Sequence, residues 1–245
     1  MLTAAAVCPH PPLLIPAAIG AAAGDPPPAL RGVRDACDVA VGALAAAAPD
    51  LIAVIGGGAA DREYDATAAG SLSEFGVTFT VGEGEPVLPL SLTIGRWLLG
   101  RAGIGAGVDE PGQRPQLLLQ AVDQRASADD CLKLGAAIAE RAPRVALLAM
   151  GDASARRARD IEGAPDPRAQ EYDDEVAEAL AAADARWLGR LDPALDGELM
   201  VAGRAAWQVL AGAAAGTRMC GRLRCMTNPY GVTYLVASWE EPRAD

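Results

Sequence analysis

The sequence predicts an α/β fold with a central, largely parallel or mixed sheet, and two observations lead to this class. An apolar segment at residues 2–7 is followed by a helical segment at residues 26–48 and by a second apolar segment at residues 51–55. Strand-like and helix-like segments then keep alternating toward the end of the chain. A strand, helix and strand in this order form a parallel pair with a right-handed crossover. With 245 residues, 51% of them hydrophobic, we expect one large domain.

The predicted strands are short apolar runs that end at turn-forming residues. The run at residues 2–7 ends where Cys8-Pro9-His10-Pro11-Pro12 begins. The clearest run, residues 51–55, leads into Gly56, Gly57 and Gly58. Further strands are expected at residues 75–81, where Phe and Val alternate with small or polar residues, at residues 145–150 and at residues 232–239.

The predicted helices show apolar residues at helical spacing. In the segment at residues 26–48, the recurring apolar residues are Leu30, Val33, Cys37, Val41 and Leu44. Ser127 is suited to cap a helix at residues 128–141, because a serine oxygen can accept from the first free backbone N–H groups. Other helices are expected at residues 91–101, 168–183 and 203–215, and residues 103–116, rich in Gly and Pro, are the best candidate for a loop.

The composition indicates which binding partners are disfavoured and which cellular compartment to expect. The net charge of −11 and the sequence pI near 4.6 disfavour binding to nucleic acid or to an anionic membrane surface. No apolar run approaches the ~20 residues that span a bilayer, and the first residues lack the basic stretch of a signal peptide. We therefore expect a cytoplasmic protein. Its scattered cysteines are expected to be reduced thiols, and they are Cys8, Cys37, Cys131, Cys220 and Cys225.

His10 is the only histidine of the chain and is the first candidate for a functional residue. It follows the first predicted strand, and ligands of open α/β sheets bind in the crevice outside the strand ends. The ring is therefore placed to act as a metal ligand or a base. Alternatively, it orders the turn by bonding to a backbone carbonyl.

Two further motifs each allow a functional and a structural interpretation. Gly56, Gly57 and Gly58 follow a strand, so they either expose backbone N–H groups to a phosphate or form a crowded strand end. Cys220 and Cys225, together with Cys8 and His10, either hold zinc or are inert thiols.

Three segments together resemble the class III extradiol ring-cleavage dioxygenase (LigB-like) family and the related Memo proteins. The first is the opening strand with residues 8–16, Cys-Pro-His-Pro-Pro-Leu-Leu-Ile-Pro. The second is residues 147–155, which is similar to the family's strand running into Ser-Gly-Asp-x-Ser-His. The third comprises residues 206–210 and 229–237. The resemblance spans nearly the whole chain and implies a single three-layer α/β/α domain over residues 1–245.

The resemblance also implies an iron site, in which two histidines and a carboxylate hold Fe(II) and another histidine serves as acid and base. His10 matches the first metal histidine. Gly56, Gly57 and Gly58 stand where the second is expected, and Ala155 stands in place of the acid/base histidine. Cys225 has the spacing to Gly231 that a cysteine of Memo proteins has.

One imidazole cannot form a site of two histidines and a carboxylate, and an alanine cannot transfer a proton. Our leading hypothesis is therefore a LigB-like protein with an incomplete non-haem iron site, which binds a small molecule or a partner protein. The candidate pocket residues are His10, Asp152, Ser154 and Tyr230.

Two other hypotheses stay open at this point. The first is a divergent metal-dependent enzyme, an extradiol-dioxygenase-like oxidoreductase or a hydrolase, that holds Fe(II) or Zn with His10, Cys225 and an aspartate. The second is a structural subunit that pairs with a separate catalytic chain in a homo- or hetero-oligomer.

Overall fold

A mixed sheet of seven strands forms the middle of the molecule, in the order β3-β7-β2-β8-β1-β10-β9. The structure, a computed structural model, describes residues 1–20, 28–104, 115–157 and 165–242. The strands of this sheet are β1 (Leu2–Cys8), β2 (Leu51–Gly58), β3 (Arg62–Tyr64), β7 (Gln116–Asp123), β8 (Val145–Met150), β9 (Cys220–Thr227) and β10 (Tyr234–Glu240). The central strands β7, β2, β8 and β1 are mutually parallel, whereas β3, β10 and β9 pair antiparallel to their neighbours. The carboxyl ends of the four parallel strands consequently meet at one edge of the sheet.

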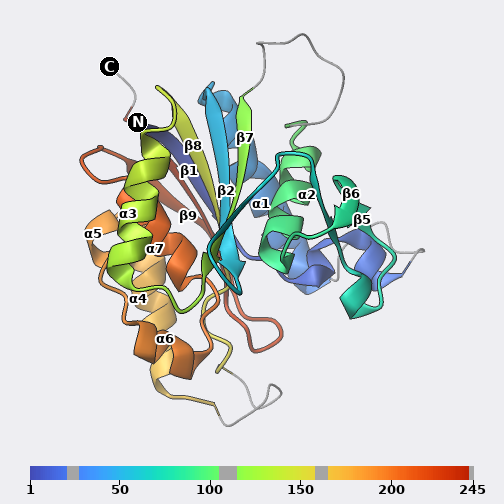
Figure 1. Cartoon of the computed structure of the whole chain (residues 1–245). Helices are drawn as coiled ribbons and strands as arrows, with labels where there is room; N and C mark the ends of the chain where they lie inside the picture. Colours follow the sequence, from blue (N-terminus) through green and yellow to red (C-terminus); the bar gives the residue numbers. More distant parts are fainter. Residues whose placement is uncertain (21–27, 105–114, 158–164, 243–245) are drawn as a thin grey trace.

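Helices cover both faces of the sheet and complete three layers (Figure 1). One face carries α1 (Pro28–Ala46) and α2 (Leu90–Arg101). The opposite face carries α3 (Ala128–Ala139), α4 (Arg168–Ala182), α5 (Ala185–Leu188), α6 (Pro193–Leu199) and α7 (Arg204–Ala213). A small sheet of β4 (Ala68–Ser71), β5 (Thr80–Val81) and β6 (Glu83–Pro86) lies beside α2. The predicted α/β class and the three layers are thus confirmed.

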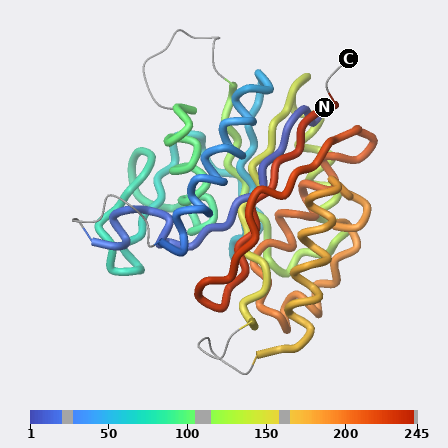
Figure 2. The backbone as a smooth tube through the Cα atoms, turned by 180° about the vertical axis from the view of Figure 1, so that it is seen from behind, coloured from blue at the N-terminus to red at the C-terminus, as the bar shows by residue number. Residues whose placement is uncertain are grey.

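The core has two halves, because alternate residues of each strand point to opposite faces of the sheet. On β1, Ala5 and Val7 belong to the half beneath α3, α4 and α7, while Ala4 and Ala6 belong to the half beneath α1 and α2. The buried strands read as continuous apolar runs, since both of their faces are covered. Figure 2 shows the same layers from behind, with β9 at the edge of the sheet nearest the viewer.

Glycines allow α3 and α7 to approach backbone to backbone. A Cβ added at Gly135 of α3 would collide with the carbonyl oxygen of Val209, and one at Gly212 of α7 would collide with that of Leu132. Small residues at a helix crossing permit this short separation, which a larger side chain would prevent.

Most of the predicted elements are confirmed, although several boundaries shift. The strands at residues 2–7, 51–55 and 145–150 and the helices at residues 91–101, 128–141, 168–183 and 203–215 appear within a few residues of their predicted bounds. Ser127 caps α3 as expected, accepting the backbone N–H of Asp130 at 3.1 Å. The helix predicted at residues 26–48 is described from Pro28 and ends at Ala46, and the last strand is Tyr234–Glu240.

One predicted strand was wrong, and several elements were not predicted. Residues 75–81 are not one strand, because Phe75 ends a 3₁₀ turn, Gly76 has a φ of 71°, and only Thr80–Val81 forms a strand. The sequence analysis also missed the strands β3, β4, β6, β7 and β9, as well as the short helices α5 and α6. Of the loop predicted at residues 103–116, residues 105–114 lie outside the described part of the chain. No helix in the described ranges is long and apolar enough to cross a membrane.

Candidate functional site

His10 and Asp152 lie side by side at the carboxyl edge of the sheet. Their strands β1 and β8 are parallel neighbours with Cys8 opposite Met150, and each residue follows its strand end by two positions. The backbone N–H of His10 donates to Oδ1 of Asp152 at 2.8 Å, and Nδ1 of the ring lies 3.7 Å from the same oxygen. The structure therefore brings two of the predicted pocket residues together.

The His10 ring is buried on the side that faces Asp152. The residue is 9% exposed, and its Nδ1 is buried without a hydrogen-bond partner among the described residues. The exposed part of the ring therefore lies away from Nδ1. The backbone N–H of His10, rather than a bond from Nδ1 to a carbonyl, ties this turn to Asp152.

Three backbone hydrogen bonds hold Asp152 and the preceding Gly151 in place. The preceding Gly151 donates its N–H to the carbonyl of Cys8 at 2.9 Å. The carbonyl of Asp152 accepts the N–H groups of Ala202 at 3.1 Å and of Gly203 at 2.9 Å. A side chain on a backbone held in this way needs little ordering when a ligand arrives.

Two tyrosines complete the surroundings of the pair. Burial raises the pKa of Tyr234, and the neighbouring Asp152 and Tyr230 raise it further, so this phenol stays protonated. Tyr234 opens β10 and is 4% exposed, whereas Tyr230 is 40% exposed. The predicted candidate Tyr230 is thus an electrostatic neighbour of Tyr234, and sequence reasoning missed Tyr234.

Ser154 does not join this cluster. Its N–H and its hydroxyl donate to Asp173 of α4 at 2.9 Å and 2.7 Å, and the hydroxyl of Thr233 donates to the same carboxylate at 2.6 Å. Arg157 lies 3.5 Å from that carboxylate, and both Ser154 and Asp173 are fully buried. Burial raises the pKa of Asp173, while these hydrogen bonds and Arg157 oppose the rise.

The Asp173 network is therefore a structural junction between β8, α4 and the approach to β10. Beyond the end of β8, the N–H of Ala153 donates to the carbonyl of Thr233 and the N–H of Thr233 donates to the carbonyl of Ser154, each at 2.9 Å. The sequence contains one indication of this structural role. Asp173 lies four residues from both Ala169 and Ala177, so it falls on the buried face of α4.

Gly56, Gly57 and Gly58 are strand residues at crowded positions. They belong to β2 and pair with Ala121, Val122 and Asp123 of β7. A Cβ at Gly56 would collide with the Ser91 side chain of α2, and one at Gly57 would lie 2.8 Å from the amide nitrogen of Gln124. Ser91 also donates to the carbonyl of Gly57 at 2.8 Å. These contacts favour the interpretation as a crowded strand end rather than a phosphate cradle.

Cys220 and Cys225 occupy positions apart from His10, whereas Cys8 ends β1 two residues before it. Cys225 lies on β9 opposite Val236, and β10 separates β9 from β1, a spacing of about 10 Å at ~4.8 Å per strand. Cys220 pairs with Glu240, which itself pairs with Ala4, so it lies toward the end of the sheet opposite His10. The described residues contain no group of three or more His, Cys, Asp or Glu side chains that could hold a metal ion.

The donors at this edge do not fit the iron site that the family resemblance implies. A site with two histidines and one carboxylate needs a second imidazole, but His10 is the only one in the chain. The strand end where the second would stand is occupied by glycines packed against Ser91 and Gln124. Ala155 offers only its backbone, which donates to Leu199 at 3.0 Å.

Comparison with known proteins supports the fold. No family model and no curated protein matches the chain. Among solved structures, it is similar to the uncharacterized protein JW3007 from Escherichia coli K12, with a TM-score of 0.55 and 15% identity over 97% of this chain and 99% of the other. The class of protein is thus a three-layer α/β protein, and the E. coli protein shares that architecture over almost its full length.

Proposed function

We propose that this chain is a LigB-like protein with an incomplete non-haem iron site, which binds a small molecule beside His10 and Asp152. One observation carries the proposal: the buried, unpartnered Nδ1 of His10 lies 3.7 Å from Oδ1 of Asp152 at the carboxyl edge of the sheet. Ligands of open α/β sheets bind outside this edge.

The groups at the site are suited to polar recognition. Asp152 supplies a carboxylate, His10 an imidazole, and Tyr234 and Tyr230 supply phenols, so a small molecule would meet both donors and acceptors. The glycine-filled end of β2 and Ala155 supply no side chain for metal binding or proton transfer. Recognition therefore fits these residues better than ring cleavage does.

The two other hypotheses receive less support. A metal-dependent enzyme built on His10 and Cys225 needs these residues to converge. His10 follows β1 and Cys225 lies on β9, and β10 separates these two strands. The idea of a subunit that pairs with a catalytic chain stays a prediction.

The single histidine allows a direct test of the proposal. In protein purified without a histidine tag, every imidazole NMR signal comes from His10. We expect anaerobic addition of Fe(II) or Zn²⁺ at one equivalent to leave these signals unchanged, because His10 and Asp152 offer one imidazole and one carboxylate and the chain has no second imidazole. We expect phenol, as a small hydroxylated probe, to shift them.

Two variants control this experiment. Asp152→Asn keeps an oxygen that can accept the N–H of His10 but removes the charge, and it should weaken the phenol-induced shift. Asp174→Asn, an exposed change on α4, should leave the shift as in the parent protein. Loss of the His10 signals at one equivalent of Fe(II), together with turnover of catechol, would refute the proposal.

A further inference from the structure

The segment that carries His10 is held at both of its ends. At one end, the backbone N–H of His10 donates to Oδ1 of Asp152. At the other end, the chain forms a 3₁₀ turn at Pro12–Leu14, in which the N–H of Leu14 donates to the carbonyl of Pro11 at 3.0 Å. Leu14 is fully buried, and this turn contacts α1. Figure 2 shows the segment after β1 running beside that helix.

Arg34 of α1 binds the far end of this segment. Its side chain lies on the buried face of the helix, and the residue is 5% exposed. Nη2 of Arg34 donates to the carbonyl of Leu14. The guanidinium carbon also lies 5.8 Å from the centre of the Trp97 ring of α2, within the roughly 6 Å of a cation–π contact. Arg34 therefore connects the His10 segment to both helices on this face of the sheet.

The residues between His10 and the turn are stiff. Pro11 and Pro12 follow His10 directly, and a proline ring fixes φ at about −65°. Pro11 accordingly has a φ of −64° and a ψ of 136°. A residue that precedes a proline is itself restricted to extended conformations, and this applies to His10 and to Pro11. Because so few dihedral angles are soft, a displacement of Leu14 is transmitted to His10 rather than absorbed between them.

A guanidinium at this buried position costs more than an apolar side chain would. A charged group loses its hydration in the interior, and apolar residues of similar volume often replace buried charges without loss of stability. On the same helix face, Leu30, Val33 and Cys37 are apolar core residues. A methionine would fill the space of Arg34 but would not donate to the Leu14 carbonyl. The guanidinium therefore contributes this hydrogen bond and the position that the bond gives to the segment.

We infer that Arg34 is a positioning residue for His10. By holding the Leu14 carbonyl, it fixes the turn at Pro12–Leu14 and thereby the orientation of the imidazole at the carboxyl edge of the sheet. The inference deepens the proposed function and rests on it for one point, namely that the ring that Arg34 positions binds a small molecule. The orientation of the ring itself is testable without any ligand.

The single histidine makes the position of this ring measurable by NMR in the whole chain. Arg34→Met keeps a long apolar side chain but removes the charge and the donors, which releases the Leu14 end of the segment. We expect the imidazole signals of this ligand-free variant to move from their parent positions and to broaden. Arg34→Lys keeps a charge and a donor but not the planar guanidinium, so its signals should be displaced less than those of Arg34→Met.

Arg101→Met is the matched control. Arg101 also lies over Trp97, 5.1 Å from the ring centre, but its hydrogen bonds go to Asp38 of α1, at 2.8 Å and 2.5 Å. This variant loses a guanidinium from the same ring and should leave the His10 signals in place. Circular dichroism and urea unfolding of each variant establish that it is folded under the NMR conditions, which separates a displaced ring from a loss of stability.

Binding provides a second readout. With phenol as the probe, we expect Arg34→Met to bind about two- to tenfold more weakly than the parent, the ratio to which one hydrogen bond corresponds, and Arg101→Met to bind equally well. Three results would overturn the inference: signals of either folded Arg34 variant that coincide with those of the parent, a larger displacement in Arg34→Lys than in Arg34→Met, or an equal displacement in Arg101→Met. If phenol shifts no signal of the parent protein, the proposed function fails, whereas the ligand-free signals still decide the role of Arg34.

Discussion

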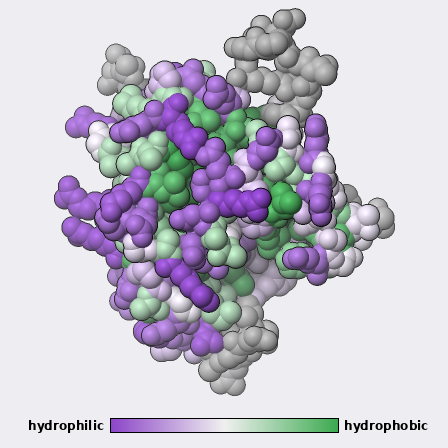
Figure 3. All heavy atoms as spheres, viewed as in Figure 1, coloured by the Kyte–Doolittle hydropathy of each residue, from purple (hydrophilic) through white to green (hydrophobic). Residues whose placement is uncertain are grey.

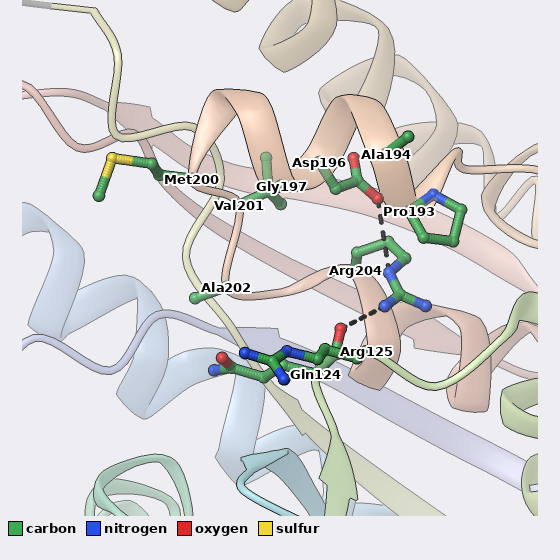
Figure 4. Close-up of a pocket in the computed structure, with 10 residues that line it drawn as sticks. All are labelled: Gln124, Arg125, Pro193, Ala194, Asp196, Gly197, Met200, Val201, Ala202 and Arg204. Carbon is green, nitrogen blue, oxygen red and sulfur yellow. Dashed lines mark hydrogen bonds and ion pairs between the residues drawn. The ribbon is translucent and has the colours of Figure 1, made fainter. Parts of the chain in front are cut away.

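At the scale of single residues, two buried carboxylates have opposite surroundings. Asp173 accepts hydrogen bonds from the N–H and hydroxyl of Ser154 and from Thr233. Asp196 instead faces the Tyr172 hydroxyl, which favours its charged form, and Nε of Arg204 at 3.6 Å from Oδ2 (Figure 4). Because burial disfavours the charged form, a carboxylate with few donors is costly in the folded state. Asp173 therefore stabilises a junction, whereas ionised Asp196 lowers the stability of the folded state.

This contrast predicts a pH-dependent effect of Asp196→Asn. The folded-state pKa of Asp196 is about 6, above the ordinary 3.8, so the neutral form favours folding. That contribution is fully present below the ordinary pKa and is lost as the pH rises through about 6. The variant should unfold in urea with a free energy roughly 1–3 kcal/mol higher than the parent at about pH 8, and the two should converge below about pH 4. A difference of the same size at both pH values would contradict this assignment, and Asp174→Asn serves as the control.

At the scale of elements, glycines set how closely neighbouring segments approach. Gly135 and Gly212 allow contact between α3 and α7, while Gly56 and Gly57 allow β2 to lie against Ser91 and Gln124. The same residue type thus serves helix packing in one place and a strand end in another.

The crossing of α3 and α7 gives a prediction with an internal control. Gly135→Ala and Gly212→Ala each place a methyl group into a carbonyl of the facing helix, and we expect each to lower the free energy of unfolding by roughly 1–3 kcal/mol or more. Gly42→Ala in α1, where nothing lies within 4 Å of the added Cβ, should raise it by roughly 0.5–1 kcal/mol through helix propensity. Chemical denaturation of the three variants checks this, and a gain in stability at Gly135 or Gly212 would disprove the close contact.

At the scale of the whole molecule, the layers determine which thiols solvent can reach. All five cysteines are free; Cys8, Cys37 and Cys131 are buried, Cys225 is half-buried and Cys220 is exposed. Burial raises the pKa of Cys225, which further slows its reaction because the thiolate is the reactive form.

The rate at which each cysteine reacts with a thiol-reactive dye should therefore report how deeply the fold buries it. We expect Cys220 to react quickly with the dye in the native protein, Cys225 to react slowly, and Cys8, Cys37 and Cys131 to react only after denaturation. Cys220→Ser should remove the fast phase and nothing else. Fast reaction of three or more thiols in the native protein would show that the layers are not packed as described here.

Charge also acts at this scale. The net charge of the whole chain is −11. On the face shown in Figure 3, hydrophilic side chains are interspersed with hydrophobic ones. That the protein avoids polyanionic partners stays a prediction from this net charge.

The sequence by itself determined the α/β class, the main buried strands and the main helices, because hydrophobic periodicity and capping residues are local signals. It also identified His10 and Asp152, since both follow predicted strands. It missed β7, whose apolar run follows a Gly- and Pro-rich stretch, and β9, whose alternating Arg residues hide an edge strand. Tertiary structure alone decided that Ser154 bonds to Asp173, that Cys225 lies two strands from β1, and that Asp196 is buried beside Tyr172 and Arg204. These facts depend on strand order and helix placement, which are set by contacts between residues far apart in the chain rather than by any local pattern.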